Sequence, residues 1–134
     1  MDSRGVAISS PGTHARMTHV VAVVVDAADP LGLACFWAAA LGREAPFTWD
    51  DPTGRTYVEL PGEPTLLFQP VPEPKAGKNR LHLDVAGGEQ ADEVARLVDL
   101  GATLLDRATG LPWIVLADPE GNELCVLPPQ RPER

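Results

Sequence analysis

Short apolar runs separated by turn residues predict that strands form most of this chain. The longest run, Val20 to Val25, is apolar on both faces, as in a buried strand, and it belongs to a strand expected over 17–26. The segment Leu81–Val85 alternates apolar and polar positions, as a strand with one covered face does. Similar runs bounded by turn residues predict strands at 45–49, 56–60, 65–69, 103–107, 113–117 and 122–127.

Two further stretches have the pattern of helices. Residues 31–41 follow Asp29, whose side chain can cap a helix, and Gly42 ends the pattern. Residues 89–100 place apolar side chains on one face and acidic side chains in the first turn, where the helix dipole favours negative charge. Gly101 then ends this second helix as Gly42 ends the first.

The same order of elements occurs twice, as βαβββ, a connector and βαβββ. The connector contains three prolines and two lysines, so it cannot be a central strand. The order predicts an α+β fold in which two βαβββ units form curved antiparallel sheets around a cavity, because such a sheet needs only one covered face. The expected divisions are a disordered tail over 1–16, one domain over 17–128 (first unit 17–69, connector 70–79, second unit 80–128) and a polar tail over 129–134.

Composition restricts the possible functions. The chain has 134 residues, of which 44% are hydrophobic and 22% charged, as in one soluble globular domain. Its net charge of -8 argues against nucleic acid or an anionic membrane as a partner, since both attract positive surfaces. With no membrane-length apolar run and no signal-peptide pattern, we expect a cytoplasmic protein. Cys35 and Cys125 have neither a disulfide-framework nor a zinc-finger spacing.

Several motifs resemble one known superfamily. Residues 29–42 fit the pattern D-P-x-x-x-x-x-F-[YW]-x-x-x-L-G, Gly101-Ala102 follows the second helix, and residues 118–123 read D-P-E-G-N-E before the last strand. With Lys78–Asp84 as the most specific piece, the chain resembles the vicinal oxygen chelate superfamily, in particular small glyoxalase-like and bleomycin resistance protein-like domains. The resemblance covers about residues 17–127 and implies the paired βαβββ fold and a homodimer.

The resemblance also implies where a metal ion would be bound. In metal-binding relatives the first and last strands of each unit supply one ligand each, and the corresponding positions here are Ala22, Leu67, His82 and Cys125. Alanine and leucine cannot ligate, so we expect no metal cofactor at this set. An alternative set of His19, His82 and Glu123 has the residue types of a site for Fe, Zn, Ni or Mn. His19, however, is three residues from Ala22 and is expected on the opposite strand face.

The implied cavity makes six residues candidate ligand contacts: Trp49, Gln69, His82, Trp113, Glu123 and Cys125. His82 is also the candidate catalytic residue, because an imidazole donates and accepts protons near neutral pH. Gln69 and Glu123 are polar residues on strands expected to face inward, where they need partners. The tryptophans are either flat walls for a planar ligand or core residues. Cys125 is expected as a small buried hydrophobe, and Asp84 as a residue that orients His82 or lies in water.

Three functions remain open at this level. The favoured one is a metal-independent glyoxalase-like protein that binds an aromatic or polar small molecule, because two ligand positions are lost. The second is a metal-dependent lyase, isomerase or dioxygenase, which rests on His82, Gln69 and Glu123 as inward polar groups. The third is an interaction module whose cavity is filled by the two tryptophans.

Overall fold

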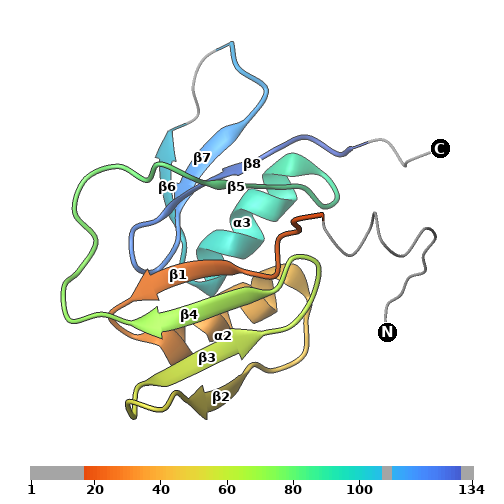
Figure 1. Ribbon diagram of the computed structural model, residues 1–134. Coiled ribbons are helices and arrows are strands. Elements are labelled where there is room, and N and C mark those ends of the chain that lie inside the picture. Colours follow the sequence, from red (N-terminus) through yellow and green to blue (C-terminus); the bar gives the residue numbers. More distant parts are fainter. Residues whose placement is uncertain (1–16, 107–109, 131–134) are drawn as a thin grey trace.

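The chain folds as two consecutive βαβββ units, each with one helix and four strands (Figure 1). The computed structural model describes residues 17–106 and 110–130, so the predicted tail over 1–16 and the end of the C-terminal tail lie outside it. The first unit comprises β1 (Val23–Ala27), α2 (Pro30–Leu41), β2 (Phe47–Asp50), β3 (Thr56–Leu60) and β4 (Leu66–Pro70). The second comprises β5 (Leu83–Val85), α3 (Gln90–Leu100), β6 (Thr103–Asp106), β7 (Ile114–Ala117) and β8 (Glu123–Val126).

Each unit forms a four-stranded sheet, in the orders β1-β4-β3-β2 and β5-β8-β7-β6. The predicted α+β class and the duplicated unit are therefore confirmed. The sheets are mixed rather than wholly antiparallel, because β1 pairs with β4, and β5 with β8, in parallel. In both units the helix returns the chain across the sheet, so the last strand of the following meander comes to lie beside the first strand. Parallel pairing brings Asp84 directly opposite Cys125.

Helix α2 begins and ends as its sequence predicts. The Asp29 side chain accepts a hydrogen bond from the Gly32 backbone N–H, and Gly42 ends the helix in the left-handed region at φ 65°. The rings of Phe36 and Trp37 meet edge to face at 5.4 Å, and both are almost completely buried. Truncating either ring to alanine would cost about 3 to 5 kcal/mol, so α2 is central to the core.

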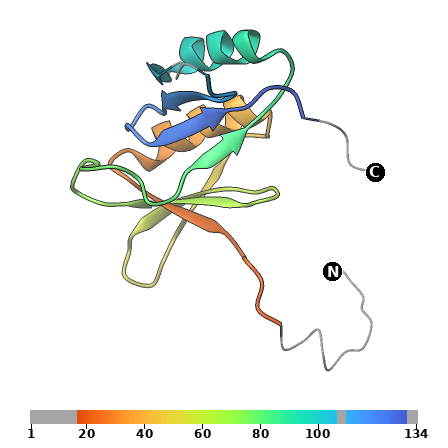
Figure 2. The same ribbon diagram turned by 90° about the horizontal axis from the view of Figure 1, so that it is seen from above.

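Helix α3 has one apolar face, on which Val94 and Leu97 are buried. On its other side, the Arg96 guanidinium donates hydrogen bonds to the carbonyl oxygens of Ala39 and Ala40 at the end of α2. Carbonyl groups in the last turn of a helix lack donors from that helix, although the Gly42 N–H also reaches the Ala39 carbonyl. The Arg96 cation also suits the negative end of the helix dipole. The two helices contact each other, and the view from above shows α3 at the upper edge of the molecule and α2 between it and the first sheet (Figure 2).

The turn after β7 joins the two units through a buried carboxylate. Asp118 is 3% exposed, and it accepts hydrogen bonds from the indole N–H of Trp37 at 3.1 Å and from the backbone N–H groups of Glu120 and Asn122. The Glu120 carboxylate in turn accepts from the backbone N–H groups that precede α2. The D-P-E-G-N-E motif therefore has a structural role, because it attaches the second unit to the first helix.

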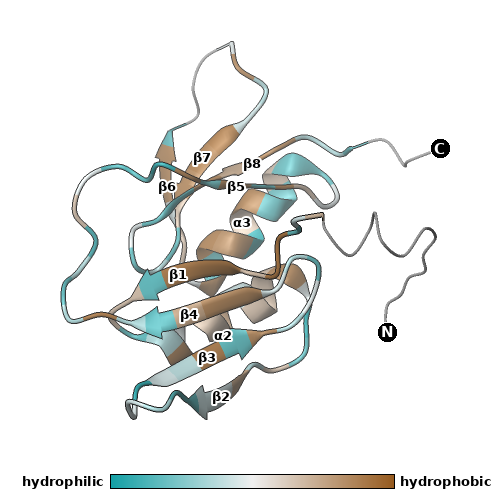
Figure 3. Ribbon diagram, in the orientation of Figure 1, coloured by the Kyte–Doolittle hydropathy of each residue, from teal (hydrophilic) through white to brown (hydrophobic). Residues whose placement is uncertain are grey.

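The first strand is shorter and more exposed than predicted. Strand β1 starts at Val23, whereas Val20 and Val21 are 79% and 77% exposed, and Val24 is 51% exposed. The prediction of burial on both faces is wrong because α2 covers only one face of this sheet. Brown, hydrophobic residues colour much of β1, β4 and β7 in Figure 3. No helix among residues 17–106 and 110–130 is long and apolar enough to cross a membrane.

Candidate functional site

A cleft of about 600 Å³ lies between the two units. Strand β1 forms one wall, and the connector and the turn over 118–123 form the other, with Trp37 and Leu66 among the lining residues. Strand β1 is fixed by its pairing with β4, while the connector is long and has no strand of its own. The contacts that hold the connector in place therefore determine the form of the cleft.

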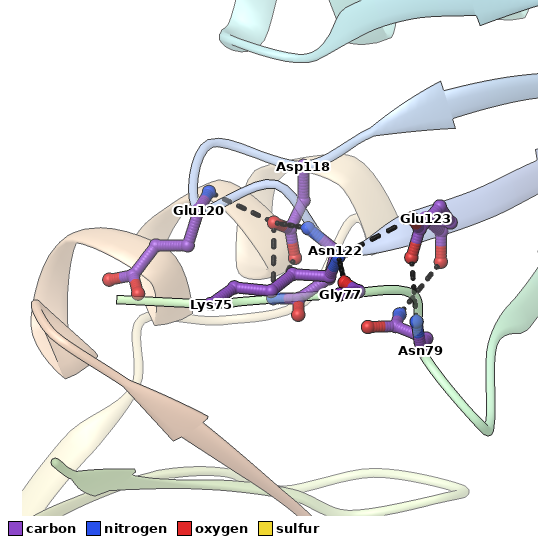
Figure 4. Close-up of polar contacts among 7 residues, drawn as sticks. All are labelled: Lys75, Gly77, Asn79, Asp118, Glu120, Asn122 and Glu123. Carbon is purple, nitrogen blue, oxygen red and sulfur yellow. Dashed lines mark hydrogen bonds and ion pairs between the residues drawn. The ribbon is translucent and has the colours of Figure 1, made fainter. Parts of the chain in front are cut away.

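Glu123 is the residue that fixes the connector (Figure 4). Its carboxylate accepts a hydrogen bond from the backbone N–H of Asn79 at 3.1 Å and lies 3.4 Å from the Lys75 ammonium. The Asn79 hydrogen bond, with a smaller contribution from Lys75, lowers the pKa of Glu123 below its ordinary value despite partial desolvation. Glu123 is thus ionised at neutral pH, and its carboxylate oxygens already accept from Asn79 and Lys75 of the connector. The main role of Glu123 is therefore to position the connector.

Beyond this anchor, the connector carries Arg80, Leu81 and His82 along the edge of the cleft. Arg80 is exposed, and 78% of Leu81 is exposed. His82 lies just before β5, with 45% of its side chain exposed. The edge of the cleft therefore combines a cation, an apolar side chain and an imidazole within three consecutive residues. His82 is the predicted catalytic and ligand-binding residue, and it does line the cleft.

His82 also belongs to a cluster on the second sheet. Its Nε2 atom lies 3.1 Å from Oδ1 of Asp84, and one donor atom each of His82, Asp84 and Cys125 lie within 4.8 Å of one another. Cys125 is 9% exposed, and desolvation together with the negative charge of Asp84 raises the pKa of its thiol. The thiol is therefore protonated at neutral pH in the free protein and is not an activated nucleophile.

Of the six predicted ligand contacts, His82 and Glu123 line the cleft, whereas Cys125 and three others, Gln69, Trp49 and Trp113, do not. The Gln69 amide donates to Asp26 Oδ1 at 2.6 Å, so its polar group is satisfied by a neighbouring strand. Trp49 stacks on Tyr57 with ring centroids 4.7 Å apart and donates to Glu59. Trp113 is 37% exposed at the start of β7. Because neither tryptophan fills the open cleft, the interaction module with a filled cavity is not supported.

The structure supports neither of the two sets of metal-ligand positions considered from the sequence. Ala22 and Leu67 carry no ligand atom, so a metal ion held between both sheets at the family positions does not fit this chain. In the alternative set, His19 is exposed and precedes β1, whereas Glu123 is held by the connector. Among the described residues, the group that can share one metal ion is His82, Asp84 and Cys125, and neither His19 nor Glu123 is part of it.

Two βαβββ units with a cleft between them place the chain in the fold class of glyoxalase and bleomycin resistance proteins. A family model described as "Glyoxalase-like domain" matches residues 22–127, and the chain belongs to this family. The match includes the cleft and the cluster on the second sheet, and it confirms the predicted resemblance. A search of curated proteins finds no match.

Solved structures confirm the fold. The trypanothione-dependent glyoxalase I of Leishmania major is 16% identical, with a TM-score of 0.65 over 84% of this chain and 87% of its own. The fosfomycin resistance protein FosX of Listeria monocytogenes is 10% identical, with a TM-score of 0.65 over 85% and 93%. A glyoxalase family protein of Enterococcus faecalis is 20% identical, with a TM-score of 0.60 over 81% and 96%. Identities this low show a common fold and do not transfer a substrate.

Proposed function

We propose that this protein binds a small molecule that has an apolar part and a polar group, in the cleft between its two units. The observation that carries the proposal is the cleft of about 600 Å³ with His82 on its edge. A volume of this size suits a metabolite-sized ligand. Apolar side chains of β1 and Leu81 provide contact area, and the imidazole of His82 and the guanidinium of Arg80 provide directional hydrogen bonds.

Other polar groups of the cleft are engaged by the protein itself. Asp118 is bonded to Trp37, Glu120 to the start of α2, and Glu123 to the connector. Because a bonded group gains little from a new partner, we assign specificity to His82 and Arg80 rather than to these carboxylates.

We further propose that this binding is metal-independent. A glyoxalase-type enzyme with a metal ion shared between its sheets needs ligands on both, and the first sheet offers Ala22 and Leu67 at the family positions. Catalytic metal sites normally use at least three protein ligands, and the family positions supply two here. The metal-dependent lyase, isomerase or dioxygenase is therefore less well supported than a binding protein.

A homodimer is part of the same proposal. Helices cover one face of each sheet, and the other face carries exposed apolar residues such as Val24, Phe47 and Leu105, which are 51%, 49% and 51% exposed. A second copy would remove these side chains from water and enclose the cleft. Sedimentation equilibrium of the wild type is expected to give the dimer mass, and Phe47→Asp is expected to shift it to the monomer mass. A monomeric wild type would contradict this part.

The binding proposal is tested by nuclear magnetic resonance titration of the full chain in excess chelator. The probes are a panel of aromatic carboxylic acids and a panel of aliphatic hydroxy acids. We expect at least one probe to shift the backbone amides of residues 79–83 and β1. His82→Ala is expected to weaken that binding about tenfold, the equivalent of one hydrogen bond of about 1.4 kcal/mol.

His19→Ala is the matched control, because His19 is exposed and lies outside the cleft lining. It is expected to leave the affinity unchanged. Binding that appears only after a metal ion is added would overturn metal-independent binding. The binding proposal itself would be overturned if neither panel shifted the amides of the cleft.

A further inference from the structure

The second sheet carries a donor cluster that the proposed binding does not use as a unit. Asp84 and Cys125 are opposite each other in the parallel β5–β8 pair, so their side chains leave the same face of the sheet. His82 precedes Asp84 by two residues and therefore projects to this face as well. The flanking residues Leu83 and Val85 turn to the other face and pack on the core.

The three side chains offer one nitrogen, one oxygen and one sulfur donor. Imidazole, carboxylate and thiolate together are the ligand types that Zn²⁺ takes in proteins. All three donor atoms already lie within 4.8 Å of one another. Donors bound to one tetrahedral Zn²⁺ ion at about 2.0 to 2.3 Å lie roughly 3.3 to 3.8 Å apart. A side-chain movement of about 1 Å therefore completes the geometry.

We propose that His82, Asp84 and Cys125 form a binding site for a thiophilic divalent cation of the Zn²⁺ class. The site lies entirely on the second sheet. It keeps the two family positions of the second unit, His82 and Cys125, and adds Asp84, which is not a family position. It uses no residue of the first sheet, and it also differs from the set of His19, His82 and Glu123 considered from the sequence. The backbone pairing of β5 with β8 fixes the positions of two of the three ligand residues on the sheet, so binding needs only their side chains to be ordered.

The charge of the ligand set suits a divalent cation, because the ion balances one carboxylate and one thiolate while the imidazole stays neutral. Binding forms the metal–sulfur bond, breaks the S–H bond and releases that proton to solvent.

Open coordination positions remain for water or a ligand oxygen. The side chains of His82 and Asp84 are 45% and 51% exposed, so the side of the cation away from the sheet faces solvent. His82 also lines the cleft, which places the cation next to the proposed small-molecule site. A bound cation would therefore be in a position to modulate ligand binding, although the cleft itself is proposed to bind without it.

The test is a Co²⁺ titration of the tag-free full chain after chelator treatment, followed by Zn²⁺ competition. Co²⁺ reports sulfur ligation by a thiolate-to-metal charge-transfer band in the near ultraviolet. We expect one equivalent of Co²⁺ to produce this band and Zn²⁺ to abolish it. Calorimetry in two buffers of different ionisation enthalpy is expected to show about one proton released per ion bound at neutral pH.

The variants identify the ligands. Cys125→Ala is expected to abolish the charge-transfer band. Asp84→Asn and His82→Ala are each expected to weaken Zn²⁺ binding by more than about a hundredfold, which exceeds the usual effect of residues outside the metal shell. The Asp84→Asn variant is expected to fold normally, because the Asp84 side chain is 51% exposed. Weaker binding in this variant therefore reports the loss of a ligand and not the loss of the fold. Circular dichroism confirms the fold of each variant.

Cys35→Ala and His19→Ala are the matched controls, since Cys35 is the other cysteine and is exposed on α2. Both are expected to retain the band and the affinity. A wild type without the band, or a band that survives Cys125→Ala, would overturn the proposal. The titration uses no organic ligand, so its failure is distinct from failure of the proposed cleft binding.

Discussion

At the scale of single residues, the role of a side chain depends on its nearest neighbours. Trp37 is an example, because its indole N–H donates to Asp118, a carboxylate that is 3% exposed. The oxygens of a buried carboxylate must accept hydrogen bonds to offset the loss of water. Three further N–H groups that donate to Asp118 come from its own turn. The indole provides the donor that comes from the other unit.

Trp37→Phe is expected to destabilise the protein by about 1 to 3 kcal/mol, since it removes a donor from a buried carboxylate. Urea unfolding monitored by circular dichroism measures the change. Trp113→Phe is the matched control, because Trp113 is 37% exposed, and its effect is expected to stay within about 0.5 kcal/mol. Equal losses in the two variants would show that the bond to Asp118 contributes nothing.

Glu123 leads to a prediction on pH. The pKa of Glu123 is lowered in the folded protein from its ordinary value of 4.5, so its contribution to stability is complete above that value. The contribution is lost as the pH falls through the lower folded pKa. Glu123→Gln is expected to cost about 1 kcal/mol at pH 7 and progressively less as the pH falls below the ordinary value.

Unfolding free energies of the wild type and of Glu123→Gln, measured across the acid range, check this prediction. Glu44 is exposed and serves as the control position. The unfolding free energy of Glu44→Gln is expected to stay close to that of the wild type at every pH. A Glu123→Gln deficit that grows on acidification would contradict the assigned direction of the pKa shift.

At the scale of elements, the sequence signals at helix ends act as expected. Asp29 caps α2, Glu89 caps α3, and glycines follow both helices. Gly42 has φ 65°, a conformation that is unfavourable for a residue with a Cβ atom. Its surroundings are open, so the backbone conformation alone decides the effect of a substitution.

Gly42→Ala is therefore expected to cost about 1 kcal/mol of unfolding free energy. Gly88→Ala is the matched control, because Gly88 also has open surroundings but no positive φ. The control is expected to be neutral or slightly stabilising, since alanine restricts the unfolded chain. Thermal and urea unfolding compare the two variants. If Gly88→Ala lowers the unfolding free energy as much as Gly42→Ala, the positive φ of Gly42 is not the cause of the loss.

At the scale of the whole molecule, the cleft depends on how the two units are attached. The Glu120 carboxylate accepts hydrogen bonds from the backbone N–H groups of Ala28 and Asp29 at 2.8 and 2.7 Å. Its negative charge also lies at the positive end of the α2 dipole. Together with Arg96 at the other end of α2, Glu120 connects the units across 92 residues of sequence.

Glu120→Ala is expected to lower stability by about 1 kcal/mol and to increase hydrogen exchange at the Ala28 and Asp29 amides about tenfold. Hydrogen exchange followed by nuclear magnetic resonance makes the measurement. Glu44→Ala, on the exposed loop after α2, is the control and is expected to leave both amides protected. Unchanged protection in Glu120→Ala would show that the units are attached by other contacts.

The sequence by itself determined the elements of this protein. Periodicity, caps and glycines depend on neighbours in the chain, so the two βαβββ units and the structural class could be predicted. The D-P-E-G-N-E motif was also visible, although its contact with α2 was not. The alternation over residues 81–85 correctly placed His82 and Asp84 on one strand face.

Tertiary structure decided which of these residues meet. Trp49 and Trp113 were candidate walls of the cavity because of their flat rings, and Gln69 because its strand was expected to face inward. Neither argument identifies the neighbour of a side chain. The pairing of β5 with β8 brought Cys125 to Asp84, and the anchor at Glu123 gave the connector its position along the cleft. Such contacts join residues more than 40 positions apart, and no local pattern encodes them. The fold therefore followed from the sequence, whereas the cleft came from the packing of the two units and the proposed cation site from the pairing of β5 with β8.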